Sequence, residues 1–209
     1  MYLPRFNQMA DAEVGAFVDA VGAAELITTG RDGYPRASRL PLLRDDGRWI
    51  FHLARANDHW RTIEPDSPAL AVVTGPEAYV SPGWYATKRE HGRVVPTWNY
   101  SAVHVTGRVS VHDDADWLRE AVTRLTDVHE RRRDLPWGVT DAPDGYITKQ
   151  LRAIVGLELR VERVEAKAKL SQNRSDEDRA GAAAGMRAEG GRREADVADA
   201  MDAARDGRG

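Results

Sequence analysis

Hydrophobic residues over the first 170 positions mostly alternate with polar ones, and two stretches instead show helical spacing. Apolar side chains recur every three or four positions over residues 8–21 and 116–133, which predicts two helices. Asp113 or Asp114 can cap the second helix. The remaining apolar segments alternate or are short, and we predict strands over residues 25–29, 35–43, 49–53, 69–74, 101–112 and 154–164.

The breaks between these segments are short and rich in turn formers. Residues 30–33 and 45–47 are typical of hairpin links. Gly75 and Pro76 are expected to stop the strand over 69–74, and Gly107 to mark a bulge or a close approach of two backbones. Strands joined by short turns, with helices between only some of them, favour a mainly β fold with helices (α+β). An antiparallel β-barrel fits this order better than a βαβ repeat.

The C-terminal stretch differs in composition from the rest. No Leu, Ile, Phe, Tyr or Trp follows Leu170. A segment with so few large apolar side chains buries little surface to offset the entropy of ordering it. We therefore expect one domain over residues 1–174 and a polar tail over 175–209 that is mobile or weakly helical. A weak apolar stripe over residues 194–205 could dock on a partner.

Composition excludes several classes of protein. The 209 residues include 30 Lys and Arg, 33 Asp and Glu and no Cys, so the formal charge is −3 and disulfides and thiolate sites are excluded. A pI near 6.1 argues against a protein that coats DNA. No apolar run is long enough for a membrane helix and the N-terminus has no signal pattern, which predicts a cytoplasmic protein without a membrane partner.

Common catalytic and nucleotide-binding motifs are missing from the sequence. It has no Gly-x-Gly-x-x-Gly or Walker loop, no Gly-x-Ser-x-Gly elbow and no His-Glu-x-x-His. Six His are scattered without metal-ligand spacing, so we predict no metal site, although pairing across strands leaves this open. Only His52, His59 and Tyr85 are candidates for an acid or base, and no catalytic residue is assigned.

Aromatic and polar residues gather in three short segments, 52–60, 78–88 and 95–100. In the first, Asn57 begins a short helix; this is either a seat for an anion or a simple helix cap, and the sequence favours neither. The other two segments contain five aromatic residues beside Pro and Gly. Trp and Tyr rings suit a flat ligand or a subunit interface, and we favour a ligand pocket over packing alone.

Four stretches of the chain together resemble one family. They are His52-Leu-Ala-Arg-Ala-Asn57 with His59-Trp60, Gly75-Pro76 through Tyr79-Val80-Ser81-Pro82 to Trp84-Tyr85, Val95-Pro96-Thr97-Trp98-Asn99-Tyr100, and Lys169-Leu-Ser-Gln-Asn-Arg174. In this order, and with Met1-Tyr2-Leu3-Pro4, the chain is similar over residues 1–174 to the PaiB-type FMN-binding negative transcriptional regulators. The resemblance implies an FMN-binding split β-barrel that forms a homodimer with the flavin at the subunit interface.

The resemblance also implies a set of cofactor-binding residues. FMN needs cations and N–H donors for its phosphate, polar donors for its ring edge and a flat apolar partner for its face. Related oxidases place a basic pair at the phosphate, whereas this chain has Asp58-His59, and Glu165–Lys169 has Ala where relatives have Gly and an aromatic. The expected cofactor-binding residues are Ser38, Arg39, His52, Leu53, Ala54, Arg55, Asn57, His59, Trp60, Trp84, Lys88, Thr97, Trp98 and Asn99.

The function implied is a flavin-binding regulator, with three alternatives. The first is an FMN-dependent oxidoreductase that uses NAD(P)H and a small molecule. The second is a haem-binding or haem-degrading barrel with His104 or His129 as ligand, and the third is an interaction module without a cofactor. Direct DNA binding is doubtful, because no helix-turn-helix pattern occurs and the basic run 131–133 is flanked by Glu130 and Asp134.

Overall fold

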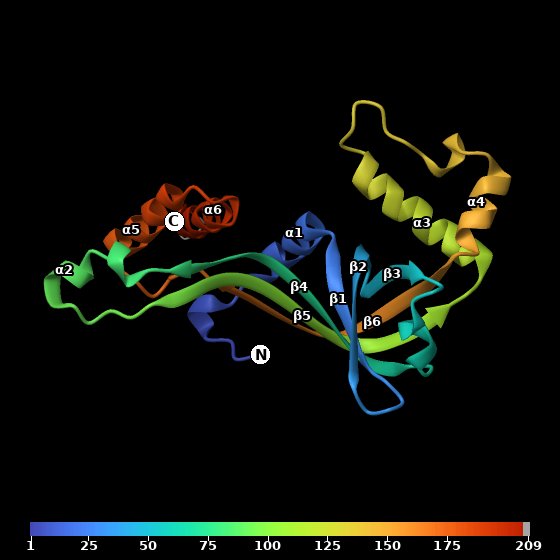
Figure 1. The fold of residues 1–209 in the computed structure, drawn as a ribbon, viewed down its shortest axis with the longest axis horizontal. Coiled ribbons are helices and arrows are strands. Elements are labelled where there is room, and N and C mark those ends of the chain that lie inside the picture. The colour runs from blue at the N-terminus through green and yellow to red at the C-terminus, as the bar shows by residue number, and fades with distance from the viewer. Residues whose placement is uncertain (207–209) are drawn as a thin grey trace. The chain divides into compact units, whose positions relative to one another are not determined.

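The computed structural model describes residues 1–206, and the surroundings of side chains through residue 204. Its strands form one closed barrel in the order β1-β2-β3-β6-β5-β4, and β1–β2, β1–β4, β2–β3 and β3–β6 pair antiparallel. This confirms a mixed α+β fold built on an antiparallel sheet (Figure 1). The strands are β1 (Ala23–Thr29), β2 (Pro35–Asp45), β3 (Arg48–Ala54), β4 (Ser67–Val80), β5 (Thr97–His112) and β6 (Ile154–Lys169).

The chain divides into two compact units that share the three long strands. Unit 1 contains residues 1–17, residues 74–103 and the chain from Glu165 onward, and unit 2 contains residues 18–73 and 104–164. β4, β5 and β6 each begin in one unit and end in the other. This division lies within the three long strands and differs from the expected boundary between a domain over residues 1–174 and a tail over 175–209, which stays a prediction.

Unit 2 contains β1, β2, β3, parts of the three long strands and the helices α3 (Ala115–Glu130) and α4 (Asp144–Leu151). α3 is capped by Asp114, whose carboxylate accepts from two backbone N–H groups. The helix packs Ala121 and Leu125 against Leu43 of β2 and Ile50 of β3. α4, which sequence periodicity did not predict, adds a second apolar contact with α3.

The strand expected over 69–74 continues to Val80, so the prediction that Gly75-Pro76 ends it is wrong. A Cβ atom at Gly75 would lie 2.6 Å from the ring of Phe17, in α1 (Asp11–Val21). The glycine therefore lets an aromatic ring pack on the strand without ending it. Gly107 behaves as expected, because a Cβ there would lie 1.9 Å from the carbonyl oxygen of Arg160.

The C-terminal stretch contains two helices, α5 (Asp176–Glu189) and α6 (Arg192–Asp206), which lie beside each other in Figure 1. Met186, Val197 and Met201 are fully or almost fully buried in a cluster with Val80 and Tyr85. The expectation of a mobile or weakly helical tail did not foresee this packing. Alanine favours helix and its small side chain lets helices approach closely, so few large side chains are needed.

Short helices complete the chain. They are η1 (Arg5–Asn7), η2 (Asp58–Thr62), η3 (Pro82–Trp84), α2 (Thr87–His91) and η4 (Val139–Asp141). None of the helices described is both long and apolar enough to cross a membrane. Within residues 1–206, no three His, Asp or Glu side chains gather as a metal site would require.

Candidate functional site

A buried histidine organises the polar end of unit 2. His59 Nε2 lies 2.9 Å from Thr28 Oγ1 of β1, and His59 Nδ1 lies 2.9 Å from Ser38 Oγ of β2. Asn57 Nδ2 donates to the same Ser38 oxygen at 3.2 Å. Both ring nitrogens of His59 are thus occupied, and the imidazole joins β1, β2 and η2 into one network.

His59 does not offer a positive charge to a ligand. Its exposed fraction is 4%, and burial, with a smaller contribution from the Arg36 guanidinium, lowers its pKa. The imidazole is therefore neutral near pH 7. Its role is to position Ser38 through the ring, while the His59 backbone N–H positions Asn57.

The first turn of η2 is already capped. Asn57 Oδ1 accepts from the backbone N–H of His59 at 3.0 Å. Of the two sequence interpretations of Asn57, the structure shows the helix cap. The Asn57 amide nitrogen donates to Ser38. Asn57 can therefore bind a ligand through its amide nitrogen, whereas its oxygen caps the helix N-terminus.

Strand alternation separates the two adjacent β2 residues expected at the site. Ser38 faces His59, whereas Arg39 lies on the other face and forms an ion pair with Glu25, its cross-strand partner on β1. Arg36 is two positions before Ser38 and shares its face. Arg36 forms an ion pair with Asp32 at 3.0 Å, and this pair is solvent-exposed and therefore weak. Arg36, Ser38 and Asn57 form what we call the Ser38 edge.

Arg55 and Trp60 have structural partners. The Arg55 guanidinium pairs with both oxygens of Asp113 and donates to two backbone carbonyls, of Arg152 and Ile154. Trp60 Nε1 donates to the Arg55 carbonyl at 3.0 Å. These contacts join the end of β3 to the end of β5 and already engage three of the Arg55 nitrogens.

The other predicted residues of β3 contribute little polarity. Leu53 is buried in the sheet and Ala54 is exposed at the strand end. His52 is half-buried, and burial lowers its pKa, so it too is neutral near pH 7. Neither His52 nor His59 has the exposure that an acid or base acting on a free substrate needs.

The remaining five predicted residues lie in unit 1. Trp84 packs on α5, where a Cβ atom at Gly185 would lie 2.4 Å from its indole ring. Asn99 is fully buried and donates to Ser171 Oγ at 3.1 Å. Trp84 and Asn99 are therefore committed to packing between β5, α5 and α6. Lys88 is exposed on α2.

Thr97 and Trp98 lie at the start of β5 and are more accessible. Trp98 is 41% exposed, and its Nε1 lies 3.4 Å from Glu77 Oε2. Thr97 Oγ1 accepts a hydrogen bond from Lys169 of β6 and lines a cavity of about 340 Å³. The structure thus brings Ser38, Asn57 and His59 together in unit 2. Two of the predicted tryptophans, Trp84 and Trp98, lie in unit 1.

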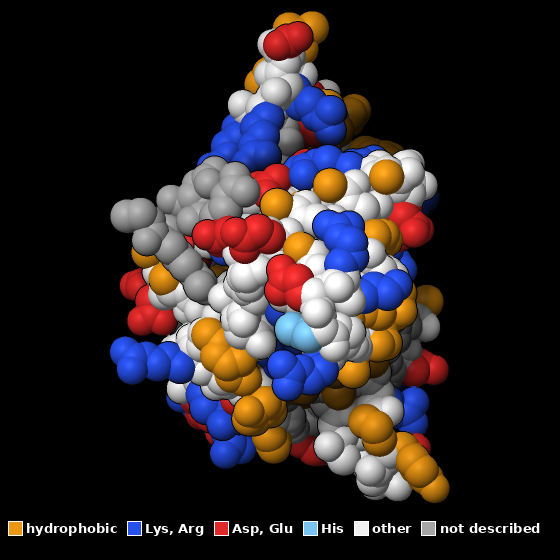
Figure 2. Space-filling view, turned by 90° about the vertical axis from the view of Figure 1, so that its left-hand side faces the viewer, with side chains coloured by type: hydrophobic (Ala, Val, Ile, Leu, Met, Phe, Trp, Pro, Cys, Tyr) orange, Lys and Arg blue, Asp and Glu red, His pale blue; other side chains and the backbone are white. Residues whose placement is uncertain are grey.

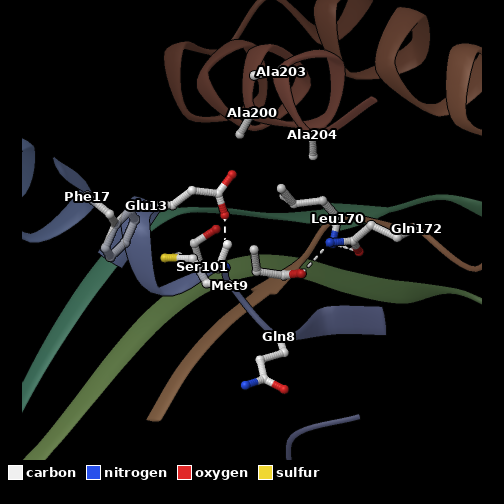
Figure 3. Close-up of a pocket in the computed structure, with 12 residues that line it drawn as sticks. Gln8, Met9, Glu13, Phe17, Ser101, Leu170, Gln172, Ala200, Ala203 and Ala204 are labelled. Carbon is white, nitrogen blue, oxygen red and sulfur yellow. Dashed lines mark hydrogen bonds between the residues drawn. The ribbon is translucent and has the colours of Figure 1, made fainter. Parts of the chain in front are cut away.

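A second cavity of unit 1, of about 410 Å³, is shown in Figure 3. Glu13 and Phe17 of α1 enter it from one side, and Ala200, Ala203 and Ala204 of α6 line it from another. One carboxylate and a row of methyl groups do not suit a phosphate. This cavity is therefore a poor candidate for the phosphate of a nucleotide.

Figure 2 looks onto the end of unit 1 that carries α2. Lys and Arg side chains lie among Asp and Glu side chains over this face, and neither sign forms a single patch. A surface that binds DNA through its phosphates needs a basic stripe. This face of the protein does not have one.

The chain matches the family described as "Putative FMN-binding domain" over residues 1–163. The chain belongs to this family. It is 37% identical over 183 residues to "Protease synthase and sporulation protein PAI 2" of Bacillus subtilis, and the match covers 85% of each chain. The PaiB-type family expected from the sequence motifs is thereby confirmed, and so is FMN as the cofactor of this domain.

Solved structures with the same fold agree with this family. The FAD and heme binding protein from Mycobacterium smegmatis has a TM-score of 0.60 at 19% identity, covering 84% of this chain and 80% of that one. The flavocytochrome Anf3 from Azotobacter vinelandii has a TM-score of 0.56 at 17% identity, covering 80% of this chain and 72% of that one. The protein is thus a member of the FMN-binding family with a split-barrel fold.

The residues of the Ser38 edge fit the phosphate of FMN. A phosphate is bound well by a guanidinium and by hydroxyl and amide donors, and a neighbouring carboxylate would repel it. Arg36, Ser38 and Asn57 supply these groups at one strand end, and the neutral His59 holds two of them in place. Arg36 was missed by the sequence analysis, although the i, i+2 spacing from Ser38 on a predicted strand could have identified it.

Proposed function

We propose that the protein is a cytoplasmic homodimer that binds FMN at its subunit interface, with the phosphate at the Ser38 edge. The observation that carries this proposal is the network in which His59 fixes Ser38 and Asn57 beside Arg36. Exposed Tyr79, Val95 and Trp98 in unit 1 supply the apolar and aromatic surface that a subunit interface or a flavin ring needs.

Bound FMN would supply electron-transfer chemistry, while the protein would hold and orient it. We propose that this flavin serves a regulator that acts through a protein partner. The support is the 37% identity to a protein named for protease synthesis and sporulation, together with the formal charge of −3 and the mixed charges in Figure 2. The neutral, enclosed His52 and His59 do not favour acid–base catalysis.

Flavin titrations of two neighbouring arginine variants test the phosphate site. Arg36→Gln is expected to weaken FMN binding about tenfold, the effect of losing one charge-assisted hydrogen bond, without changing riboflavin binding. Arg39→Gln is the matched control, since it removes the same group from the opposite face of β2 and should change FMN binding less than about twofold. The reverse order of effects would move the phosphate to the other face of the strand.

The regulatory role has its own test. The wild-type protein loaded with FMN is mixed with NADH or NADPH, and flavin absorbance is followed without and with air. A regulator is expected to show no sustained turnover. Rapid, repeated oxidation of NAD(P)H would instead support the flavin-dependent oxidoreductase.

A further inference from the structure

The 340 Å³ cavity of unit 1 differs from the other cavities in its charge. Three cationic side chains line it, Lys167, Lys169 and Arg174, and its lining contains no carboxylate. Four other cavities within the described residues all have at least one Asp or Glu in their lining. We call this space the Lys169 cavity.

The two lysines are placed where their charge is costly. They lie two positions apart on β6 and so share a face, Lys167 is 7% exposed and Lys169 is half-buried. Lys167 Nζ donates to the Tyr2 carbonyl at 3.0 Å and lies over the Tyr2 and Tyr100 rings. Lys169 Nζ donates to Thr97 Oγ1 and the Trp98 carbonyl.

All of these acceptors are neutral groups, so they do not cancel the charge of either ammonium. Burial and the neighbouring Lys167 lower the pKa of Lys169, which reflects the same cost. Buried cations are usually paired with a carboxylate or another anion. Lys169 uses two of its three N–H donors and Lys167 one, which leaves donors for an additional acceptor.

A second, independent feature of the cavity is a phenol without a partner. Tyr85 is 1% exposed and lines the cavity, and its Oη makes no hydrogen bond of acceptable geometry within the described residues, although Ser171 and Arg174 lie nearby. The Arg174 guanidinium lies 4.7 Å from the centre of the Tyr85 ring. Burial raises the pKa of Tyr85, so the phenol stays protonated and can donate.

One carboxylate close to Tyr85 and Arg174 is already engaged. Asp178 interacts electrostatically with both Tyr85 and Arg174. Its two oxygens, however, accept from the Thr87 backbone N–H at 2.9 Å and from the Thr87 hydroxyl at 2.7 Å. It is not part of the cavity lining. The charge inside the cavity therefore remains positive.

We propose that the Lys169 cavity binds the phosphate or carboxylate group of a small anionic molecule, with Lys169, Arg174 and Tyr85 Oη as its direct ligands. These residues belong to unit 1, whereas the Ser38 edge belongs to unit 2, so the proposal concerns a different set of residues. The anion is either a separate small molecule or the phosphate of a flavin nucleotide, and in the second case that phosphate would not lie at the Ser38 edge.

The full-length protein is titrated with inorganic phosphate and with pyrophosphate by calorimetry in low-salt buffer. Lys169→Met is expected to weaken binding of both about tenfold, and Tyr85→Phe several-fold, since each removes one donor to the anion. Lys149→Met is the matched control, because Lys149 is exposed on α4, and it should leave binding unchanged.

Unfolding of the same variants separates ligand binding from a structural role. Tyr85→Phe removes an oxygen that makes no hydrogen bond with the protein, so this variant should not unfold more easily without ligand. Lys169→Met loses the hydrogen bonds to Thr97 Oγ1 and the Trp98 carbonyl as well as the repulsion from Lys167, so its unfolding is measured first and its binding is compared where it is fully folded. Clear destabilisation by Tyr85→Phe, without any change in anion binding, would show that the phenol is structural and overturn the proposal.

Flavin titrations identify the source of the anion. If the site receives the FMN phosphate, Lys169→Met weakens FMN binding about tenfold and leaves riboflavin binding unchanged. If the anion is a separate molecule, FMN binding is unchanged and phosphate binding is lost. Equal binding of phosphate, pyrophosphate and FMN by wild type, Lys169→Met and Tyr85→Phe would refute the site. Failure of the wild type to bind FMN would refute the proposed function and leave the phosphate result standing.

Discussion

Replacing His59 by Leu removes the residue that joins Thr28 to Ser38 while keeping a side chain of similar size. Thr28 is 3% exposed, so its hydroxyl would be left buried without a partner, at a cost of about 1–3 kcal/mol. Ser38 keeps the Asn57 amide and loses one bond worth about 0.5–1.5 kcal/mol. We expect His59→Leu to lower the free energy of unfolding by about 2–4 kcal/mol.

A double-mutant cycle isolates the hydrogen bond from the change in packing. Thr28→Val alone leaves His59 Nε2 unpaired and should cost about 1–3 kcal/mol. With both substitutions neither side retains an orphaned group, so the double variant should be more stable than the sum of the single effects by about 1–2 kcal/mol. Urea unfolding followed by tryptophan fluorescence measures all four proteins. Additive effects to within about 0.5 kcal/mol would refute a coupled His59–Thr28 pair.

Three further predictions concern pH, the C-terminal helices and one glycine. Because the pKa of His59 is lowered in the folded protein, the unfolded chain binds the proton more readily, and stability should fall as the pH drops below about 6.5. His59→Gln should reduce this pH dependence in urea unfolding, and the part that remains is due to His52, whose pKa is also lowered. Deleting the chain after Arg174 removes the buried Met186 and should raise amide exchange in β4, and unchanged exchange would contradict the packing of α5 and α6 on unit 1. Gly107→Ala should lower stability by at least about 2 kcal/mol, and a thermal midpoint equal to wild type would show that the strands can separate there.

Much of the barrel could be predicted because its strands alternate strongly. β1, β2 and β3 begin within two residues of the predicted positions, since the turns at residues 30–33 and 45–47 are encoded locally. The end of β4 could not be predicted in this way. The strand continues through Gly75-Pro76, and the close approach of the Phe17 ring at Gly75 involves a residue that is distant in sequence.

The C-terminal helices show the limit of reasoning from composition. A stretch without large apolar residues is usually unable to form a core by itself. Here Val80, Tyr85 and Leu170 already form part of the core, and α5 and α6 complete it with alanines and the buried Met186. Hydrophobicity of the segment alone cannot reveal a surface supplied by another part of the chain.

Part of the candidate site could be predicted because it lies in local sequence motifs. Asn57 and His59 belong to a motif of the family, and they meet Ser38 of β2 because η2 follows β3 directly. The opposite orientations of Ser38 and Arg39 follow from strand alternation, but which of the two faces His59 depends on how β2 pairs and packs, and the sequence pattern did not determine this. The burial of Lys167 depends on Tyr2 and Tyr100, which are remote in sequence, so no local motif identifies it.

Native mass spectrometry of the protein purified with added FMN tests the central claim most directly. The account predicts a particle of two 23.2 kDa chains that carries two FMN molecules, and no comparable particle with riboflavin at the same concentration. Single chains without flavin, at concentrations where the protein is folded, would contradict it.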